Sequence, residues 1–340
     1  MNSMIEIDGS FGEGGGQIVR TAVALSALTN KPVKVFNIRA KRKNPGLSYQ
    51  HITAVESVRR LCDAEIKGLG KGSSAVEFHP KKIKGGVFDF DVGTAGSVTL
   101  VLQCCLLPSL LADETVKIKI RGGTDVKWSP PVDYFSHVFL EILSKMGVKT
   151  ELKIIKRGCY PKGGGEINVN IEPVKELKEL DLSQTAETKN INGTAFISNL
   201  PEHILKRIKN SALKKLIEYD VKIKDETSPS FSPGAGITLW TDTLLGASCL
   251  GEKGLSAEKV GENAANNLLL EIKSGATLDV YASDQILPYL ALAKNKSVFL
   301  TRKISMHAET NMWLIKKFVD VKFDIKERNG LKRVETVPTP

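Results

Sequence analysis

The chain has 340 residues, of which 41% are hydrophobic, 25% charged and 6% aromatic, a composition that excludes a disordered or fibrous protein. The 48 Lys and Arg residues exceed the 38 Asp and Glu residues and give a formal net charge of +10. This balance favours a polyanionic partner such as nucleic acid or a nucleotide, although a Lys-rich solvated surface has the same balance. The longest apolar stretch, residues 98–112, contains Gln103 and Pro108. It is shorter than the roughly 20 residues that span a bilayer, so it predicts a buried helix.

The amino terminus, MNSMIEIDGS, has neither the basic nor the apolar segment of an export signal. We therefore expect a cytoplasmic protein with no membrane partner. The five cysteines are an odd number and include no C-x-x-C pair. They predict free thiols rather than a disulfide scaffold or a zinc site.

Three segments of the chain repeat one order of elements: strand, turn, helix, strand, polar loop, helix and two closing strands. The opening strands are expected at residues 4–8, 87–92 and 277–281, and the second strands at 33–38, 116–120 and 297–301. The second helices are expected at 50–62, 132–146 and 307–319. The predicted fold class is α/β in α+β layers, with three repeated βαβαββ units forming a large domain.

The segment between the second and third units does not follow this order and predicts a smaller inserted α/β domain. The predicted boundaries are a large catalytic domain over 1–178 and 276–340, with repeats at about 1–80, 81–178 and 276–340, and an inserted small domain over 179–275. Insertions are tolerated at surface loops of an autonomous core, so we expect the large domain to carry the site.

A glycine-rich segment between the first predicted strand and helix is the first chemical signal. Its sequence is DGSFGEGGGQ, and such a turn presents backbone N–H groups and a helix amino terminus to a phosphate. The segment lacks the third glycine of the dinucleotide fingerprint, and the chain contains no P-loop motif. Glu13 and Arg20 indicate a phosphate site in which Mg²⁺ or Mn²⁺ bridges Glu13 to the phosphate. A tight turn with positive-φ glycines has the same composition.

A basic segment and two histidines are the other signals. The segment RAKRKNPGLSYQH combines four cations with Tyr49, which suits phosphates and a stacked base, although a solvated basic loop is the alternative. His51 and His307 occupy the same place in the first and third units, at the head of the second helix. A histidine there is usually a cap or packing residue. The neighbouring turn and loop favour a site role for His307, in which a neutral imidazole acts as nucleophile or general base.

These segments together resemble the RNA 3′-terminal phosphate cyclase family. The motifs GSFGEGGGQIVRTA, IRAKRKNPGLSYQH, GTAGSVTLVLQ, GGTDVKWSPPVDY, YPKGGGEI, YASDQILP and HAETN occur in the order and spacing of that family. The resemblance implies three βαβαββ units with one inserted domain. It also implies that ATP adenylylates a histidine with release of pyrophosphate, that AMP passes to the RNA 3′-phosphate, and that the vicinal 2′-hydroxyl closes a 2′,3′-cyclic phosphate with release of AMP.

The resemblance assigns roles to the residues of the matching motifs. The nucleophile falls on His307, the metal-binding glutamate on Glu13 and the phosphate-contacting arginine on Arg20. The adenine is expected between Tyr281 and Pro131. The other residues expected at the nucleotide site are Gln103, Ala282, Ser283, Asp284 and Gln285, and those expected to bind RNA phosphates are Arg39, Arg42, Gln50 and His51. The implied partners are ATP, Mg²⁺ or Mn²⁺, and RNA with a 3′-terminal phosphate, and no oligomeric state is predicted.

Two other functions use related folds. Cyclase-like proteins of ribosome biogenesis share the fold without the nucleophilic histidine and act in rRNA processing without catalysis. The intact HAETN motif, with His307, argues against that alternative. Enolpyruvyl transferases contain similar units but resemble two copies of this body, so 340 residues are too few.

Overall fold

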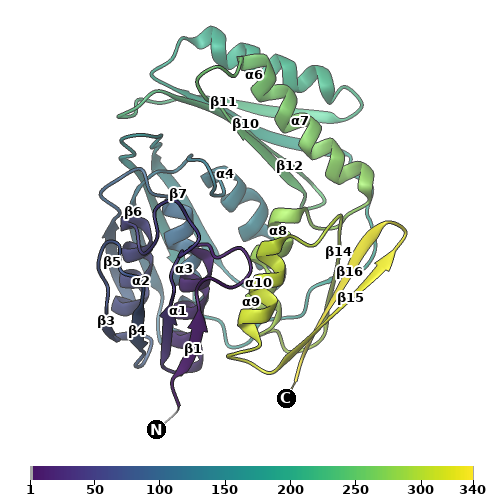
Figure 1. Ribbon diagram of the computed structural model, residues 1–340. Helices are drawn as coiled ribbons and strands as arrows, with labels where there is room; N and C mark the ends of the chain where they lie inside the picture. The colour runs from purple at the N-terminus through teal and green to yellow at the C-terminus, as the bar shows by residue number, and fades with distance from the viewer. Residues whose placement is uncertain (1–2, 340) are drawn as a thin grey trace.

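The protein is a mixed α/β structure with four four-stranded sheets, described in a computed structural model over residues 3–339 (Figure 1). The helices are α1 (Gln17–Thr29), α2 (Tyr49–Cys62), α3 (Val98–Ser109), α4 (Val132–Tyr134), the π-helix η1 (Phe135–Phe139), α5 (Leu140–Lys145), α6 (Glu202–Lys215), α7 (Ala257–Ser274), α8 (Val280–Gln285), α9 (Leu287–Leu290) and α10 (Met306–Ile315). Over residues 3–339, no helix is long and apolar enough to cross a membrane.

The first two sheets have the same strand order and pairing. One contains β1 (Ile5–Asp8), β2 (Val33–Phe36), β4 (Val76–His79) and β3 (Glu65–Lys67), in that order. The other contains β5 (Gly86–Asp91), β6 (Val116–Gly122), β8 (Gly165–Ile171) and β7 (Thr150–Lys156). In each sheet the first pair is parallel and the other two are antiparallel. Because paired parallel strands end at the same edge, the turns after β1 and β2 leave one edge together, as do those after β5 and β6.

The third sheet contains β9 (Asp181–Leu182), β14 (Ser297–Thr301), β16 (Leu331–Pro338) and β15 (Val321–Arg328), with the same pattern of one parallel and two antiparallel pairs. The strand expected at 277–281 is wrong, because helix α8 begins there. The Asp279 carboxylate accepts the N–H groups of Tyr281 and Ala282 and so caps a helix. The strand in this place of the sheet is β9, which lies inside the segment 179–275 but pairs with β14.

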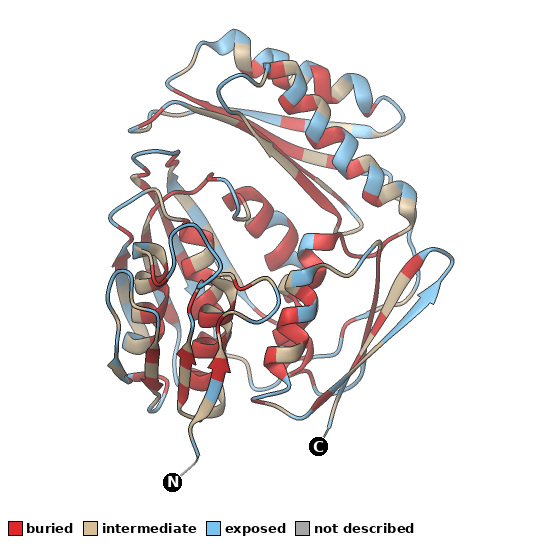
Figure 2. Ribbon diagram, viewed as in Figure 1, coloured by how far each residue is buried: buried red, intermediate tan, exposed pale blue. Residues whose placement is uncertain are grey.

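The fourth sheet has its own hydrophobic core. It contains β11 (Asp220–Thr227), β10 (Asn190–Ser198), β12 (Gly234–Thr241) and β13 (Gly246–Leu250). Helices α6 and α7 cover its outer face (Figure 1). The buried cluster beneath them includes Ile191, Ile208, Leu239 and Leu268, and the buried stripes of both helices face the sheet in Figure 2.

One continuous hydrophobic core joins the first three sheets. Helices α1, α2 and α3 contact one another, and α1 also contacts α10. Most residues of α1 and α3 are buried, and Val23, Leu25 and Leu102 are fully buried. The apolar stretch 98–112, predicted to be a buried helix, contains α3. The helix predicted at 132–146 is instead divided into α4, η1 and α5.

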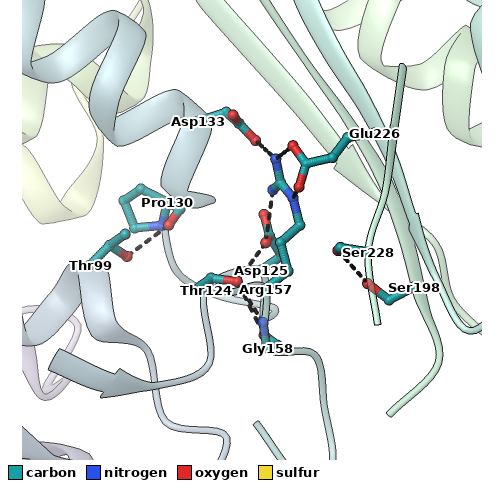
Figure 3. A network of polar contacts seen from close by, with 10 residues as sticks. All are labelled: Thr99, Thr124, Asp125, Pro130, Asp133, Arg157, Gly158, Ser198, Glu226 and Ser228. Carbon is teal, nitrogen blue, oxygen red and sulfur yellow. Dashed lines mark hydrogen bonds and ion pairs between the residues drawn. The ribbon is translucent and has the colours of Figure 1, made fainter. Parts of the chain in front are cut away.

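A buried ion cluster joins the fourth sheet to the rest of the protein (Figure 3). The Arg157 guanidinium lies 3.1 Å from Asp125 and 2.8 Å from Asp133, and it donates two hydrogen bonds of 2.6 and 2.8 Å to Glu226 on β11. Burial alone would lower the pKa of Arg157, but the three carboxylates raise it. Burial raises the pKa values of Asp125 and Asp133. The single arginine therefore holds three acidic groups from three separate segments.

We expect Arg157→Ala to destabilise the protein by about 3 to 5 kcal/mol, because it leaves buried carboxylates without their cation. Urea denaturation followed by circular dichroism measures this loss. The control is Arg207→Ala, which removes an exposed ion pair with Glu258 and is expected to leave the midpoint almost unchanged. Equal midpoints for the two variants would show that the cluster does not hold the fold together.

Candidate active site

The glycine-rich turn after β1 packs directly on helix α10. Gly12 has a φ of +55°, and a side chain there would place its Cβ 2.5 Å from Oγ1 of Thr310. The ring of Phe11 stacks on Trp313 with centroids 3.9 Å apart. Only glycine allows both the left-handed backbone and the close contact. The turn is therefore fixed against the start of α10, which carries His307.

Helix α10 is fixed at its amino terminus by two polar side chains. The N-cap residue Ser305 accepts the N–H of Ala308 at 3.0 Å, as the side chain at this position usually does. Asn311 donates to the backbone oxygen of Asp284 at 2.9 Å and accepts the Thr21 hydroxyl at 3.4 Å. Asn311 thus joins α10 to both α8 and α1. These contacts hold the first turn of α10 in one orientation.

His307 contacts the glycine-rich turn through both ring nitrogens. Nδ1 is hydrogen-bonded to the amide oxygen of Gln17, and because an amide oxygen can only accept, Nδ1 carries the hydrogen. The Gln17 amide nitrogen also donates to the backbone oxygen of His307 at 3.2 Å. Nε2 lies 2.9 Å from Oε2 of Glu13. In the neutral imidazole, the lone pair is therefore on Nε2.

The environment of His307 favours the neutral imidazole. Burial lowers its pKa, and the cations Arg20 and Arg42 lower it further, which together outweigh the opposite effect of Glu13. The contact between Nε2 and the Glu13 carboxylate is attractive only when the imidazole is protonated. In the neutral form, which the lowered pKa favours, the Nε2 lone pair is available for attack.

Two arginines lie beside His307. Arg42 pairs with Oε1 of Glu13 at 2.6 Å. Burial lowers the pKa of Arg20 to about 10, so it stays charged at neutral pH. Within residues 3–339, no carboxylate lies within ion-pair distance of the Arg20 guanidinium. A half-buried cation with no acidic partner, close to a helix amino terminus, is suited to bind an anion such as phosphate.

Asp284 lies next to the first turn of α10. Its side chain is buried and accepts a 3.1 Å hydrogen bond from Ser305, the N-cap residue of that helix. Burial raises the pKa of Asp284 to about 8, with smaller contributions from Asp279 and Glu13. Asp284 thus borders the same anion-binding space as Glu13.

The residues predicted to bind adenine form a second group connected to the first through α8. Gln103 donates to the side chain of Gln285 at 3.1 Å, and Gln285 donates to the backbone oxygen of Tyr281 at 2.9 Å. The Tyr281 ring is 68% exposed and so can receive a base. Pro131 is the N-cap residue of α4, and α4 is tied to the start of α8 by a 2.7 Å hydrogen bond between Tyr134 and Asp279.

Ala282 and Ser283 are buried within α8, and the Ser283 hydroxyl donates to the backbone oxygen of Val280. Their side chains therefore stabilise the helix, and their predicted part in nucleotide binding stays a prediction.

The residues predicted to bind RNA are found in different surroundings. Arg39 donates to the backbone oxygen of Gly46 at 2.7 Å, and Gln50 accepts the N–H of Ser97 at 2.8 Å. His51 is 7% exposed and forms a capping box with Ser48, and burial beside Arg20 and Arg39 lowers its pKa to about 3. Of the four, Arg42 pairs with Glu13, and His51 lies beside Arg20 and against Gly16 of the glycine-rich turn. RNA binding by these residues stays a prediction.

The predicted metal ligand, Glu13, is a single carboxylate. Across residues 3–339, no cluster of three or more His, Cys, Asp or Glu residues could hold a metal ion. One carboxylate nevertheless fits Mg²⁺, which commonly takes one or two protein carboxylates together with substrate phosphates and water. The unpaired Arg20 and the buried Asp284 beside Glu13 fit such a shared site.

Sequence reasoning missed Gln17 as a functional residue. Its side chain determines which His307 nitrogen carries the hydrogen, although the two residues are 290 positions apart. The signal was present, because Gln17 ends the GEGGGQ motif at the first position of α1.

Comparisons with known proteins identify the family. A family model described as RNA 3′-terminal phosphate cyclase matches residues 11–325. Proteins with that name from Methanopyrus kandleri and Methanosarcina barkeri are 45% and 46% identical, over 96% and 97% of this chain and 97% and 99% of their own length. The corresponding Pyrococcus furiosus protein is 44% identical over 97% of both chains. The chain therefore belongs to the RNA 3′-terminal phosphate cyclase family.

Among solved structures, the enolpyruvyl transferase NikO from Streptomyces tendae superposes with a TM-score of 0.31 and 10% sequence identity. The superposition covers 100% of this chain and 66% of the transferase chain. A likeness this weak supports no conclusion about function.

We expect Gly12→Ala to destabilise the protein by about 2 to 4 kcal/mol, because it adds backbone strain to a clash with Thr310. The matched control is Gly72→Ala, which also has a positive φ but has no atom within 4 Å of the new Cβ. Thermal or urea unfolding compares the two. An equal loss in both variants would mean that the contact between the turn and α10 contributes nothing.

Proposed function

We propose that this protein is an ATP-dependent RNA 3′-terminal phosphate cyclase that works through a covalent histidyl-AMP intermediate on His307. The observation that carries the proposal is the state of His307, which is held by Gln17 so that Nε2 has the lone pair and lies among Glu13, Arg20 and Arg42. Membership of the family supports the same conclusion.

In the first step, Nε2 of His307 attacks the α-phosphorus of ATP. A phosphorus–nitrogen bond forms, the bond to the β-phosphate oxygen breaks, and pyrophosphate leaves. Gln17 keeps the hydrogen on Nδ1 and directs Nε2. Arg20 and Arg42 neutralise the charge that develops on the phosphate oxygens. The adenine lies against the exposed ring of Tyr281, near Pro131 and the Gln103–Gln285 pair.

In the second step, an oxygen of the RNA 3′-phosphate attacks the phosphorus of the adduct, and His307 is released. The terminal phosphate is a poor electrophile because its leaving group would be oxide, but AMP is a good leaving group once the pyrophosphate link has formed. The neighbouring 2′-hydroxyl then attacks the 3′-phosphorus, closes the 2′,3′-cyclic phosphate and expels AMP. Arg20 and Arg42 would stabilise the negative phosphate charge in each of these steps.

Bound Mg²⁺ or Mn²⁺ would neutralise phosphate charge in this site. Glu13 would be its carboxylate ligand, and Asp284 lies close enough to shape the same space. To bind the metal ion, the Glu13 carboxylate would leave its contact with His307, and Nε2 would then be accessible to the substrate.

The alternative is a non-catalytic protein that acts in rRNA processing. Such a protein has no need for a polarised histidine. The combination of Gln17, His307 and the unpaired Arg20 favours the catalytic function.

The proposal includes the organisation of the chain. We take the first three sheets as three copies of one βαβαββ unit and the fourth sheet as an inserted domain. Because β9 pairs with β14, the insertion would begin after Leu182 rather than at residue 179.

We expect His307→Ala to abolish the covalent AMP adduct and cyclisation while the protein stays folded. Labelling with ATP that carries a radioactive α-phosphate measures the adduct, and thermal unfolding checks the fold. The control is His203→Ala, which replaces an exposed histidine on α6. An adduct of normal yield in the His307 variant would place the nucleophile elsewhere.

The rate of adduct formation should be level as the pH falls through 6.5, the ordinary pKa of histidine, and should decline only at lower pH. The sign follows from the lowered pKa of His307, because only the neutral imidazole attacks. Single-turnover labelling over a pH series, with an NMR titration of His307, measures both quantities. A decline that is half complete above pH 6.5 would contradict this description of the site.

A further inference from the structure

A large groove lies between the fourth sheet and the second sheet, away from the group around His307. Its volume is about 1030 Å³. Leu152 and Ile154 of β7 form one wall together with His137 of η1, and the inner face of the fourth sheet forms the other. None of the residues assigned above to nucleotide or metal binding lines it. The groove therefore has no part in the proposed adenylylation and cyclisation steps.

The inner face of the fourth sheet is polar because its apolar residues point the other way. Ile191 and Ala195 of β10 are buried under α6 and α7, so the alternating residues Asn192 and Thr194 line the groove. The groove also covers the edge strand β11, where residues 221–224 line it, including Lys222 and Lys224, and it reaches Lys209 and Leu213 of α6. A sheet face with this pattern is suited to a polar, charged ligand rather than to a hydrophobic one.

Two features of the groove match a single-stranded nucleic acid. The first is positive charge. Lys224 has no carboxylate within ion-pair distance in the described part of the chain, and Lys222 has only Asp220 at 3.9 Å on its own strand. The second is an aromatic surface, formed by His137 and Trp240, whose rings are parallel with centroids 4.2 Å apart. Lysines bind the backbone phosphates of a single strand, and aromatic rings stack on its bases.

The acidic residues of the groove do not oppose this charge. Asp133 and Glu226 line it, but both pair with Arg157, whose guanidinium is completely buried. The same cluster fixes β11 to α4 and so holds the two walls of the groove together (Figure 3).

Outside the groove, β7 runs on toward the edge of the second sheet from which the turns after β5 and β6 leave. Beyond Ile154 on β7, the Lys156 ammonium lies 3.8 Å from the ring centroid of Phe231, which is exposed. The loop that follows packs Gly163 against Ala95, in the turn after β5, where a Cβ would lie 2.8 Å from the backbone. One cation and one exposed ring, Lys156 and Phe231, therefore lie between the groove and the turn that precedes α3, the helix of Gln103.

From this arrangement we propose that the groove binds the single-stranded RNA segment on the 5′ side of the 3′-terminal phosphate. This inference rests on the proposed cyclase function. Lys222 and Lys224 would bind backbone phosphates, and Trp240 with His137 would stack a base. The fourth sheet would then increase the affinity for longer RNA without taking part in the chemistry.

The test measures KM for cyclisation with a short and a long 3′-phosphorylated RNA, of about 4 and about 16 nucleotides. The wild-type protein should prefer the long RNA. The double variant Lys222→Ala with Lys224→Ala should lose this preference and lower the slope of log affinity against log salt for long RNA by about 1.4. The control, Lys214→Ala with Lys215→Ala, removes the same charge from the exposed side of α6 and should keep both properties. Adduct formation from ATP alone, measured first, establishes that each variant is folded.

The outcomes separate this inference from the proposed function. A wild-type protein that forms no adduct and cyclises neither RNA would overturn the cyclase function and the groove proposal with it. Normal wild-type activity, with the same length preference and salt slope in both double variants, would overturn the groove alone. A photo-crosslink from a thiolated base upstream of the 3′ end to β12 or η1 would support the groove, and a crosslink confined to the basic loop 39–43 would contradict it.

Discussion

The contact between the glycine-rich turn after β1 and the start of α10 is the constraint on which the candidate site depends. Gln17 and His307 are 290 residues apart, yet one amide group bonds to both the imidazole and the backbone of the histidine. The positive φ of Gly12 allows the turn to lie against Thr310. Without that approach, the orientation of His307 and the position of Glu13 would both be lost, because both come from the same two segments.

The same contact sets the electrostatics of the site. Burial and the two arginines favour the neutral form of His307, and Arg20, which has no acidic partner among the described residues, leaves positive charge in the space in front of it. A neutral nucleophile beside a cation such as Arg20 is suited to attack a phosphate ester, because the substrate supplies the missing negative charge. Glu13 partly fills that role in the free protein through its pair with Arg42.

Much of this arrangement could be predicted from the sequence. Helix α3 lies in the apolar stretch predicted to be a buried helix, and α2 and β14 lie where the repeated order of elements placed them. The first strand of the third sheet could not be predicted, because β9 is two residues long and pairs with a strand distant in sequence. Residues 277–281 have strand-like composition, but the Asp279 carboxylate accepts two backbone N–H groups and so caps a helix there. Local pattern carries no information about such long-range pairing.

The candidate site was predictable only in part. Motif order indicated that Glu13, Arg20 and His307 act together, and the structure places all three in one group. The same reasoning gave the four basic-loop residues one role, whereas Gln50 and His51 make structural contacts and Arg42 pairs with Glu13. The Arg157 cluster also escaped prediction, because its members come from four separate segments and form no motif.

The central claim is that Gln17 fixes the hydrogen of His307 on Nδ1, so that Nε2 is the nucleophile. The most direct measurement is NMR of the AMP adduct formed on protein that carries isotope-labelled histidine, which identifies the nitrogen bonded to phosphorus. The structure predicts a single bond, from Nε2 of His307. A bond from Nδ1, or an adduct on any other residue, would contradict it.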